Sequence, residues 1–381
     1  MLEVLRSLDC PPSSSIAAIA YFCKMVPNAI CVVAKSPIPG KSKTRLGLAS
    51  TSSSSRDAST PAPNNAPPGL TDEGCAKMAK AMLCDVLVGI HTSPSLSSVV
   101  KFLYHAPADA DGRKRMGAIL EELDIPYRRR GCSGDEQYEV QECTATPKTT
   151  IDTWYLCPMP DAHRSNLRSS DLGSKLAGML EQTRSMVQTE FGNDNDGGDG
   201  TPSSLPAVAF LGMDSPELPT EEIAYALELA SGRSKNSNVA TNSSNNKGLA
   251  HINPSHDGGY GMLCLPPQAP PSVFEGVRWS DPLTAVSQMK ALSDEGIAVT
   301  VGSLMRDIDE MEDLVGLAKR LRLARSRKCG EGSGEDSGKD IDKGDKLVRP
   351  PPGRGIDGAG PDNGNTCHYS WEAIQQLKIG C

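Results

Sequence analysis

Basic side chains crowd the segment that follows the first strand-like run of the sequence. Lys35, Lys41, Lys43 and Arg45 fall close together in a chain whose net charge is −8. Backbone N–H groups and cationic side chains offset the charge of a pyrophosphate. The segment is therefore interpreted either as a nucleotide phosphate site or as a solvated basic turn, and it lacks the Gly-x4-Gly-Lys-Ser/Thr spacing of a Walker A loop. The predicted phosphate-binding residues are Lys35, Pro39, Gly40, Lys43, Thr44 and Arg45.

A carboxylate follows another buried strand-like run, in the sequence Gly-Met-Asp-Ser-Pro that contains Asp214. Mg²⁺ and Mn²⁺ prefer carboxylate, water and phosphate oxygens as ligands. Asp214 is thus a candidate metal ligand and catalytic residue. The alternative is that its side chain only makes a turn hydrogen bond.

A third candidate is the stretch His-Asp-Gly-Gly-Tyr, in which Asp257 precedes Gly258, Gly259 and Tyr260. Paired glycines allow close approach of the backbone to a ligand, although Asp-Gly and Gly-Gly are also common in simple turns. We predict that Asp257 is a second metal ligand and catalytic residue, or that it orients the acceptor. Gly258, Gly259, Tyr260 and Trp279 are predicted to bind substrate, with a place in the core as the alternative for Trp279.

Two weaker candidates remain. Asp171-Leu172-Gly173 opens a predicted helix and is equally well explained as an ordinary cap. In Asp307-Ile308-Asp309, Asp309 lies three residues before Glu312, which is typical of a capping box. We therefore assign Asp309 to capping rather than to metal binding. No general base stands out.

The elements that must position these residues alternate between strand and helix. Continuous apolar runs at 29–34, 99–104 and 207–211 predict strands covered on both faces. Helical periodicity follows at 71–87 and 175–187, the first capped by Thr71. Such alternation predicts an α/β sandwich with a mainly parallel sheet, whose ligands collect at the carboxyl ends of the strands.

Composition limits the globular part to less than the 381 residues. Gly and Pro together make 65 residues, while aromatic residues are only 4%, so part of the chain is expected to be loop or disorder. We predict an N-terminal extension at 1–25, a globular domain at 26–324 and a disordered tail at 325–381. Low-complexity insertions are predicted at 50–69, 192–205 and 231–248.

Charge and hydropathy exclude several classes of protein. An acidic chain is a poor ligand for nucleic acid or for an anionic membrane. No apolar run approaches the ~20 residues that span a bilayer. The twelve cysteines include no Cys-x-x-Cys pair, and several fall in apolar runs, which favours reduced thiols. Near the N-terminus, Glu3 and Asp9 with only Arg6 as a cation are a poor signal or transit peptide, so we predict a cytoplasmic protein, with a weak targeting segment as the alternative for the extension.

Taken in order, these motifs resemble one family, the rSAM/selenodomain-associated transferases of the GT-A-like nucleotide-diphospho-sugar transferase superfamily. The resemblance covers roughly residues 26–324. It rests on Lys-x-Pro-x-Pro-Gly-x-x-Lys-Thr-Arg-Leu from Lys35, on the Asp-Leu-Gly, Gly-x-Asp-x-Pro and Asp-Gly-Gly-Tyr elements, on Phe-x-Gly-x-x-Trp-Ser from Phe274, and on the closing Asp-x-Asp…Asp-Leu from Asp307. One departure is Ser174-Lys175, where the family usually carries Glu-Arg.

The resemblance implies a Rossmann-like GT-A three-layer sandwich with an aspartate-bound divalent ion. The implied function is a metal-dependent transferase that uses a nucleotide-sugar or nucleotide donor, Mg²⁺ or Mn²⁺, and a small-molecule acceptor. Two alternatives stay open: a guanylyltransferase-like nucleotidyltransferase that releases pyrophosphate, and a nucleotide-binding module without catalysis. The donor base, the sugar, the acceptor and the oligomeric state are not predicted.

Overall fold

The computed structural model describes residues 26–47, 69–129, 150–160, 171–192, 205–232, 248–330 and 367–379. The predicted extension at 1–25 lies outside these residues, as do most of the predicted insertions. The described chain forms two compact units. The first comprises the described residues within Met1–Ala34, Pro94–Gly212 and Ile223–Leu304; the second comprises those within Lys35–Ser93, Met213–Glu222 and Met305–Cys381.

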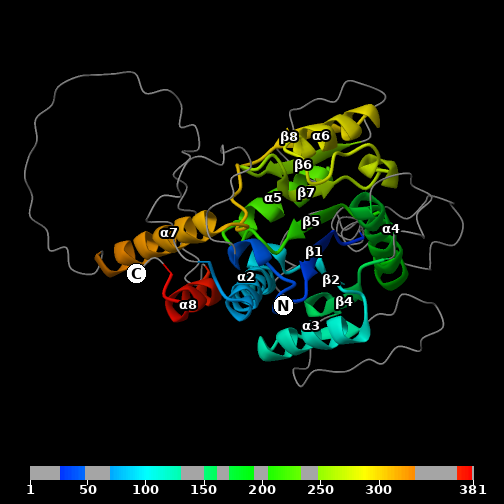
Figure 1. The fold of residues 1–381 in the computed structure, drawn as a ribbon. Helices are drawn as coiled ribbons and strands as arrows, with labels where there is room; N and C mark the ends of the chain where they lie inside the picture. Colours follow the sequence, from blue (N-terminus) through cyan, green and yellow to red (C-terminus); the bar gives the residue numbers. More distant parts are fainter. Residues whose placement is uncertain are drawn as a thin grey trace, which may run out of the picture. The chain divides into compact units, whose positions relative to one another are not determined.

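An eight-stranded sheet forms the first unit, with the strand order β3-β4-β2-β1-β5-β7-β6-β8 (Figure 1). Pairing is parallel for β1 with β5, β2 with β4, β3 with β4 and β6 with β8, and antiparallel where β7 meets β5 and β6. The strands are β1 (Ala29–Lys35), β2 (Val100–Ala106), β3 (Tyr127–Arg129), β4 (Trp154–Pro158), β5 (Val208–Gly212), β6 (Leu249–Pro254), β7 (Tyr260–Leu265) and β8 (Ala298–Val301). The predicted α/β fold with a mainly parallel sheet is confirmed.

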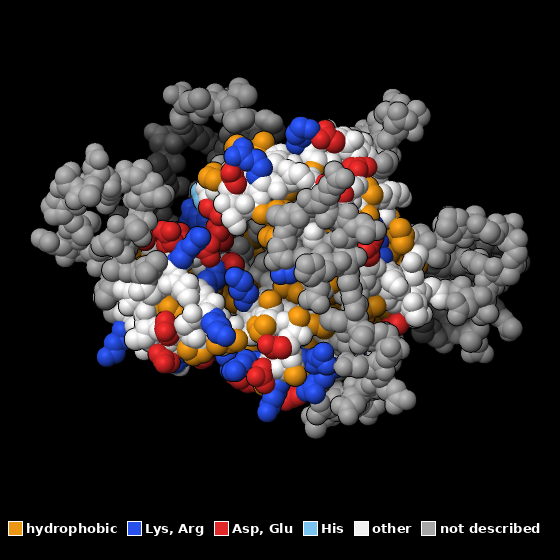
Figure 2. All heavy atoms as spheres, turned by 45° about the vertical axis from the view of Figure 1, so that its right-hand side comes forward, with side chains coloured by type: hydrophobic (Ala, Val, Ile, Leu, Met, Phe, Trp, Pro, Cys, Tyr) orange, Lys and Arg blue, Asp and Glu red, His pale blue; other side chains and the backbone are white. Residues whose placement is uncertain are grey.

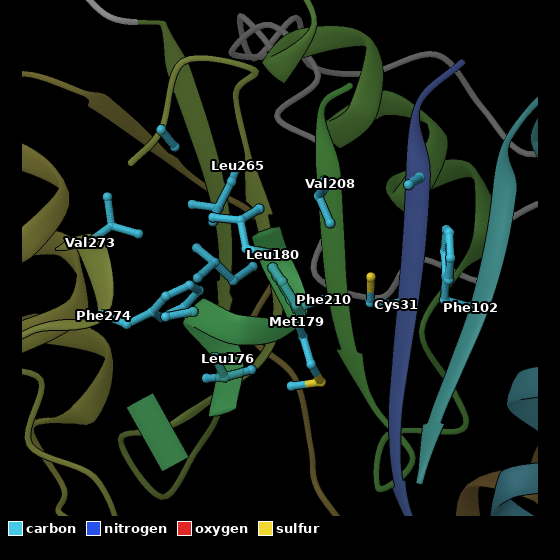
Figure 3. Packing of buried hydrophobic residues seen from close by; sticks show 14 of the residues in the cluster. Cys31, Phe102, Leu176, Met179, Leu180, Val208, Phe210, Leu265, Val273 and Phe274 are labelled. Carbon is cyan, nitrogen blue, oxygen red and sulfur yellow. The ribbon is translucent and has the colours of Figure 1, made fainter. Parts of the chain in front are cut away.

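Helices cover both faces of this sheet. On one face, α4 (Asp171–Phe191) and the short helix η6 (Pro271–Phe274) pack against the strands. Figure 3 shows Met179 and Leu180 of α4 beside Phe210 of β5 and Phe274 of η6. Burying side chains of this size stabilises the fold by about 1.5–3 kcal/mol each. The apolar runs of the strands thus account for the core of this face.

The alternation of side chains along each strand determines which residues lie on the opposite face of the sheet. Because successive side chains of a strand point to opposite faces, Leu103 and His105 lie opposite Phe102 and Tyr104. Here α3 (Ala110–Glu122) packs against β2 and β4. The remaining described helices of this unit are the short η3 (Pro94–Leu96) and η4 (Thr150–Asp152), α5 (Thr220–Ala230), which overlaps both units in sequence, and α6 (Thr284–Asp294).

The second unit is helical and has a core of its own. It contains η2 (Thr44–Gly47), α2 (Asp72–Thr92), α7 (Met311–Gly330) and α8 (His368–Gln376). The predicted cap of α2 is present, because Thr71 Oγ1 accepts a hydrogen bond from Gly74 N at 3.1 Å. Leu46, Met78, Leu317 and Ile374 are among its buried residues.

The prediction of a disordered tail at 325–381 is corrected in the two parts of it that the structure describes, because both are helical. Helix α7 continues to Gly330, and α8 forms at residues 368–376. Asp85 of α2 anchors α8, since its carboxylate accepts hydrogen bonds from Tyr369 N at 2.9 Å and Ser370 N at 2.8 Å. An anion at a helix N-terminus satisfies N–H groups that have no partner within the helix. The buried Ile374 adds apolar contact that composition alone did not reveal.

Candidate functional site

Lys43 occupies the centre of the charged cluster in the second unit. Its Nζ lies 2.8 Å from Asp214 Oδ1 and donates a hydrogen bond to Asp309 Oδ1 at 2.5 Å. Arg45 Nη1 lies 3.7 Å from Asp309 Oδ2. Three segments that are far apart in the sequence thus bring two cations and two carboxylates together.

Sheet topology explains why two of these segments start near one another. Strands β1 and β5 are parallel neighbours, with Val33 opposite Gly212 in the register. The carboxyl ends of parallel neighbours lie at the same edge of a sheet. The chain leaves β1 towards Lys43 and leaves β5 towards Asp214, and both segments enter the second unit.

The turn that presents Lys43 is held by backbone and hydroxyl contacts. Ser42 Oγ donates to Ser36 O at 2.6 Å and accepts from Ile38 N at 2.9 Å. Gly40 has φ +69°, which glycine adopts without steric cost. Lys43 itself has φ +50°, an uncommon conformation for a residue with a side chain. These hydrogen bonds fix the turn. They thereby keep Lys43, which carries the central charge, in this uncommon backbone conformation.

Electrostatics favour an ionised Lys43. Burial lowers the pKa of the Lys43 ammonium, but the negative charges of Asp214 and Asp309 and the hydrogen bond to Asp309 outweigh this effect, so the pKa lies above its ordinary value. The Lys43 side chain is 9% exposed, whereas the side chains of Asp214 and Asp309 are 39% and 36% exposed. Asp214 Oδ1 is a buried atom that makes no regular hydrogen bond within the described chain. Its contact with Lys43 is therefore an ion pair without ideal hydrogen-bond geometry.

The capping role predicted for Asp309 is wrong. Asp313 accepts the hydrogen bonds from Asp309 N at 3.2 Å and Glu310 N at 2.9 Å, ahead of α7. The carboxylate of Asp309 instead faces Lys43 and Arg45. This pairing was not predicted, because the spacing to Glu312 favoured a local explanation. The only signal for it in the sequence is the closing Asp-x-Asp motif of the family resemblance.

The other predicted phosphate-binding residues surround Lys43 along the chain. Lys35 is the last residue of β1 and is exposed, and Pro39, Gly40 and Thr44 are exposed in the turn and at the start of η2. Arg45 is 67% exposed. Exposed cations on a held turn are accessible to an anionic ligand, while Lys43 is already engaged by two carboxylates.

Asp257 belongs to the first unit, in a turn that the chain holds tightly. Its Oδ1 accepts a hydrogen bond from Gly259 N at 2.8 Å and another from Ser255 Oγ. Gly258 has φ +88°, and a Cβ there would lie 1.9 Å from Pro282 O. No other residue type fits at position 258 without displacing the backbone. Asp257 itself is exposed.

Tyr260 and Trp279 meet in the same unit, with ring centroids 6.4 Å apart. Tyr260 Oη donates to Gln288 Oε1 at 3.2 Å, and burial raises the pKa of Tyr260. Trp279 packs partly buried against the core, and its indole Nε1 is buried without a hydrogen bond among the described residues. The core alternative for Trp279 therefore has direct support, whereas its role in substrate binding stays a prediction.

Metal binding by Asp214 together with Asp257 also stays a prediction, since these residues belong to different units. Within the ranges that the structure describes, no group of three or more His, Cys, Asp and Glu side chains is arranged to hold a metal ion. None of the described helices is both long and apolar enough to cross a membrane.

Comparisons with known proteins relate part of the chain to a bacterial family. Residues 159–281, about a third of the chain, match the family described as "Uncharacterized protein conserved in bacteria (DUF2064)". The match includes Asp214, Asp257 and Trp279 but excludes Lys43 and Asp309. No curated protein matches the sequence.

Two solved structures are similar to the chain at low identity. The first is a "putative nucleotide-diphospho-sugar transferase" from Desulfovibrio desulfuricans, with 19% identity and a TM-score of 0.49 over 80% of this chain and 91% of that one. The second is CMP:2-keto-3-deoxy-manno-octonic acid synthetase complexed with CTP, with 9% identity and a TM-score of 0.34 over 79% of this chain and 99% of that one. Neither TM-score reaches 0.5.

Proposed function

We propose that the protein is a metal-dependent transferase that takes a nucleotide-sugar or nucleotide donor. The observation that supports this proposal is the position of the Lys43 ammonium between the carboxylates of Asp214 and Asp309. A cationic turn and two carboxylates at one place suit a diphosphate bound together with a divalent cation.

We assign the metal to Asp214 and Asp309 in place of Asp214 and Asp257. Both carboxylates already contact one positive charge, and Asp214 Oδ1 is a buried oxygen without a regular hydrogen bond. Oxygen ligands of this kind are those that Mg²⁺ and Mn²⁺ prefer. When bound, the ion would stabilise negative charge that develops on phosphate oxygens.

Lys43 and Arg45 have different tasks in this proposal. Lys43 balances the two carboxylates in the state described here, and its flexible four-carbon stem allows the ammonium to turn to a phosphate oxygen. Arg45 is largely exposed, so it is available to a diphosphate without breaking a buried contact. The held turn at Ser36–Ser42 keeps both cations on the same short segment.

The decisive experiment measures nucleotide binding with and without Mn²⁺. We expect thermal stabilisation by one nucleotide or sugar nucleotide that requires Mn²⁺, because a ligand of the native state raises its apparent stability. Asp214→Asn and Asp309→Asn should each abolish the Mn²⁺ requirement and most of the affinity in calorimetry. The matched control is Asp294→Asn, an exposed aspartate that pairs with Lys290.

Asp257→Asn distinguishes the two metal assignments. Loss of Mn²⁺-dependent binding in Asp257→Asn but not in Asp309→Asn would restore the pair predicted from the sequence. Unchanged Mn²⁺ dependence in Asp214→Asn would contradict the metal site altogether. Product analysis then separates the reactions: release of nucleoside diphosphate identifies glycosyl transfer, release of pyrophosphate identifies nucleotidyl transfer, and binding without turnover identifies a non-catalytic module.

A further inference from the structure

A second group of cations lies in the first unit, on α3 and the edge strand β3. It surrounds an open pocket of about 460 Å³, within the ~300–1,000 Å³ usual for small-molecule sites. The lining residues are Ala110, Arg113, Lys114, Ala118, Glu121 and Arg129. The three cations and one carboxylate leave a local charge of about +2 in a chain whose net charge is −8. None of these residues belongs to the Lys43 cluster.

Arg129 is held in place before any ligand arrives. Its Nη2 donates to Tyr127 Oη at 2.9 Å and lies 3.7 Å from Glu121 Oε1. Its guanidinium stacks 5.6 Å from the centroid of the Tyr127 ring, and Tyr127 Oη donates to Glu121 Oε1 at 2.7 Å. An arginine fixed by stacking and hydrogen bonds loses little conformational entropy when it binds an anion.

Two donors at the pocket lack an acceptor. Arg113 Nε and Arg129 Nε are buried and make no hydrogen bond within the described chain. Buried N–H groups are normally paired with protein or ordered water, and an unpaired one costs free energy. Negative charge bound in the pocket would stabilise these two guanidinium groups electrostatically.

The remaining lining is small and apolar. Ala110 and Ala118 contribute only methyl groups. At Gly117, a Cβ would lie 2.7 Å from Tyr127 Oη and 3.4 Å from Arg129 Nη2. Glycine at this position therefore permits the packing that fixes Arg129. The lining thus combines three cations with small apolar groups, which leave room for a short carbon skeleton.

We propose that this pocket binds a small phosphomonoester, with Arg113 and Arg129 on the phosphate oxygens and Lys114 as a further cation. A phosphate dianion matches the local charge of about +2 better than a monoanion does. A polyanion is disfavoured, because Glu121 is part of the lining and the whole chain is acidic. Figure 2 shows Lys and Arg side chains interspersed with Asp and Glu side chains on the face that it draws. The proposal is independent of the donor site at Lys43.

Calorimetry with glycerol 3-phosphate tests the pocket, with glycerol and dicarboxylic malonate as comparison ligands. We expect binding of glycerol 3-phosphate that weakens with added NaCl, and none of glycerol. Arg113→Gln and Arg129→Gln should each weaken this binding by about tenfold or more, as loss of a charge-assisted hydrogen bond implies. The matched control is Arg115→Gln, an exposed cation of α3 that does not line the pocket.

The variants distinguish phosphate binding at this pocket from phosphate binding at the proposed donor site. Loss of binding in Arg45→Gln but not in Arg113→Gln would place the phosphate at the Lys43 cluster and overturn the proposal. An equal loss of glycerol 3-phosphate binding in Arg115→Gln would attribute the effect to general surface charge and would overturn the proposal. Tighter binding of malonate than of glycerol 3-phosphate would overturn it as well. Arg113→Gln leaves the Tyr127–Glu121–Arg129 contacts intact, so it keeps the test valid if Arg129→Gln fails to fold.

Discussion

The ammonium of Lys43 and the carboxylate of Asp214 form an ion pair at 2.8 Å, between the segment that follows β1 and the segment that follows β5. Asp309, ahead of α7, shares the same ammonium. A buried cation with two carboxylates offsets its own desolvation, whereas removal of one partner leaves an uncompensated charge. The pair therefore ties three chain segments together through one side chain.

Replacement of Lys43 by methionine tests this tie. Lys43→Met keeps the length of the side chain but leaves Asp214 and Asp309 to repel each other. We expect a loss of about 1–3 kcal/mol in the free energy of unfolding, reduced from the fully buried case because both carboxylates are partly exposed. Urea denaturation measures it. Lys41→Met, at an exposed lysine of the same turn, should change stability little.

The same variant reports on metal binding. If Asp214 and Asp309 hold a divalent cation, Mn²⁺ should restore part of the stability that Lys43→Met loses, because the ion replaces the missing positive charge. An equal response of wild type and Lys43→Met to Mn²⁺ would contradict that assignment.

Gly258 is predicted to be irreplaceable for a steric reason. At Gly258→Ala, the new Cβ meets Pro282 O at 1.9 Å in a backbone with φ +88°, and we expect a loss of about 3 kcal/mol or more. Gly276 also has a positive φ, +70°, but nothing lies within 4 Å of its Cβ position. Gly276→Ala should therefore cost only about 1 kcal/mol. Similar melting temperatures for the two variants would refute the steric argument.

His105 should make the protein sensitive to acid. Burial lowers the pKa of His105, and the charge of Arg113 lowers it further; its Nδ1 lies 2.8 Å from Pro107 O. Because the folded state binds the proton less readily than the unfolded state, stability is complete above the ordinary pKa of 6.5 and falls as the pH drops through the lowered value.

Unfolding measured from pH 7.5 to pH 5 checks this direction. His105→Gln should flatten the decline of the free energy of unfolding over this range. His256→Gln, at an exposed histidine, should keep the wild-type slope. A slope in His105→Gln that equals that of wild type would assign the acid sensitivity to other groups.

The docking of α8 depends on Asp85. Asp85→Ala removes the acceptor of two N–H groups at the start of α8, which typically costs about 0.5–2 kcal/mol. We expect faster hydrogen exchange at residues 368–376 while the exchange of β1 and β5 is unchanged. Lys77→Ala, at an exposed position of α2, is the control, and equal exchange of α8 in both variants would exclude Asp85 as its anchor.

The sequence by itself determined most of the strands and helices and the short charged segments. Continuous apolar runs, such as Ala29–Ala34, specify buried strands because hydrophobic periodicity is a local property. Strand β3 is too short, at Tyr127–Arg129, to leave such a pattern. The order of motifs likewise indicated that Lys43 and Asp214 belong to one site.

Only the tertiary structure decided which residues the charged side chains pair with. Asp309 has a plausible capping partner three residues away, yet its carboxylate pairs with Lys43, which is distant in sequence. Ile374 of α8 carries no periodic signal strong enough to predict burial, yet it packs in the core that also contains Met78 of α2. Ion pairs and core contacts of this kind depend on where distant segments meet, and the spacing of residues along the chain does not contain that information.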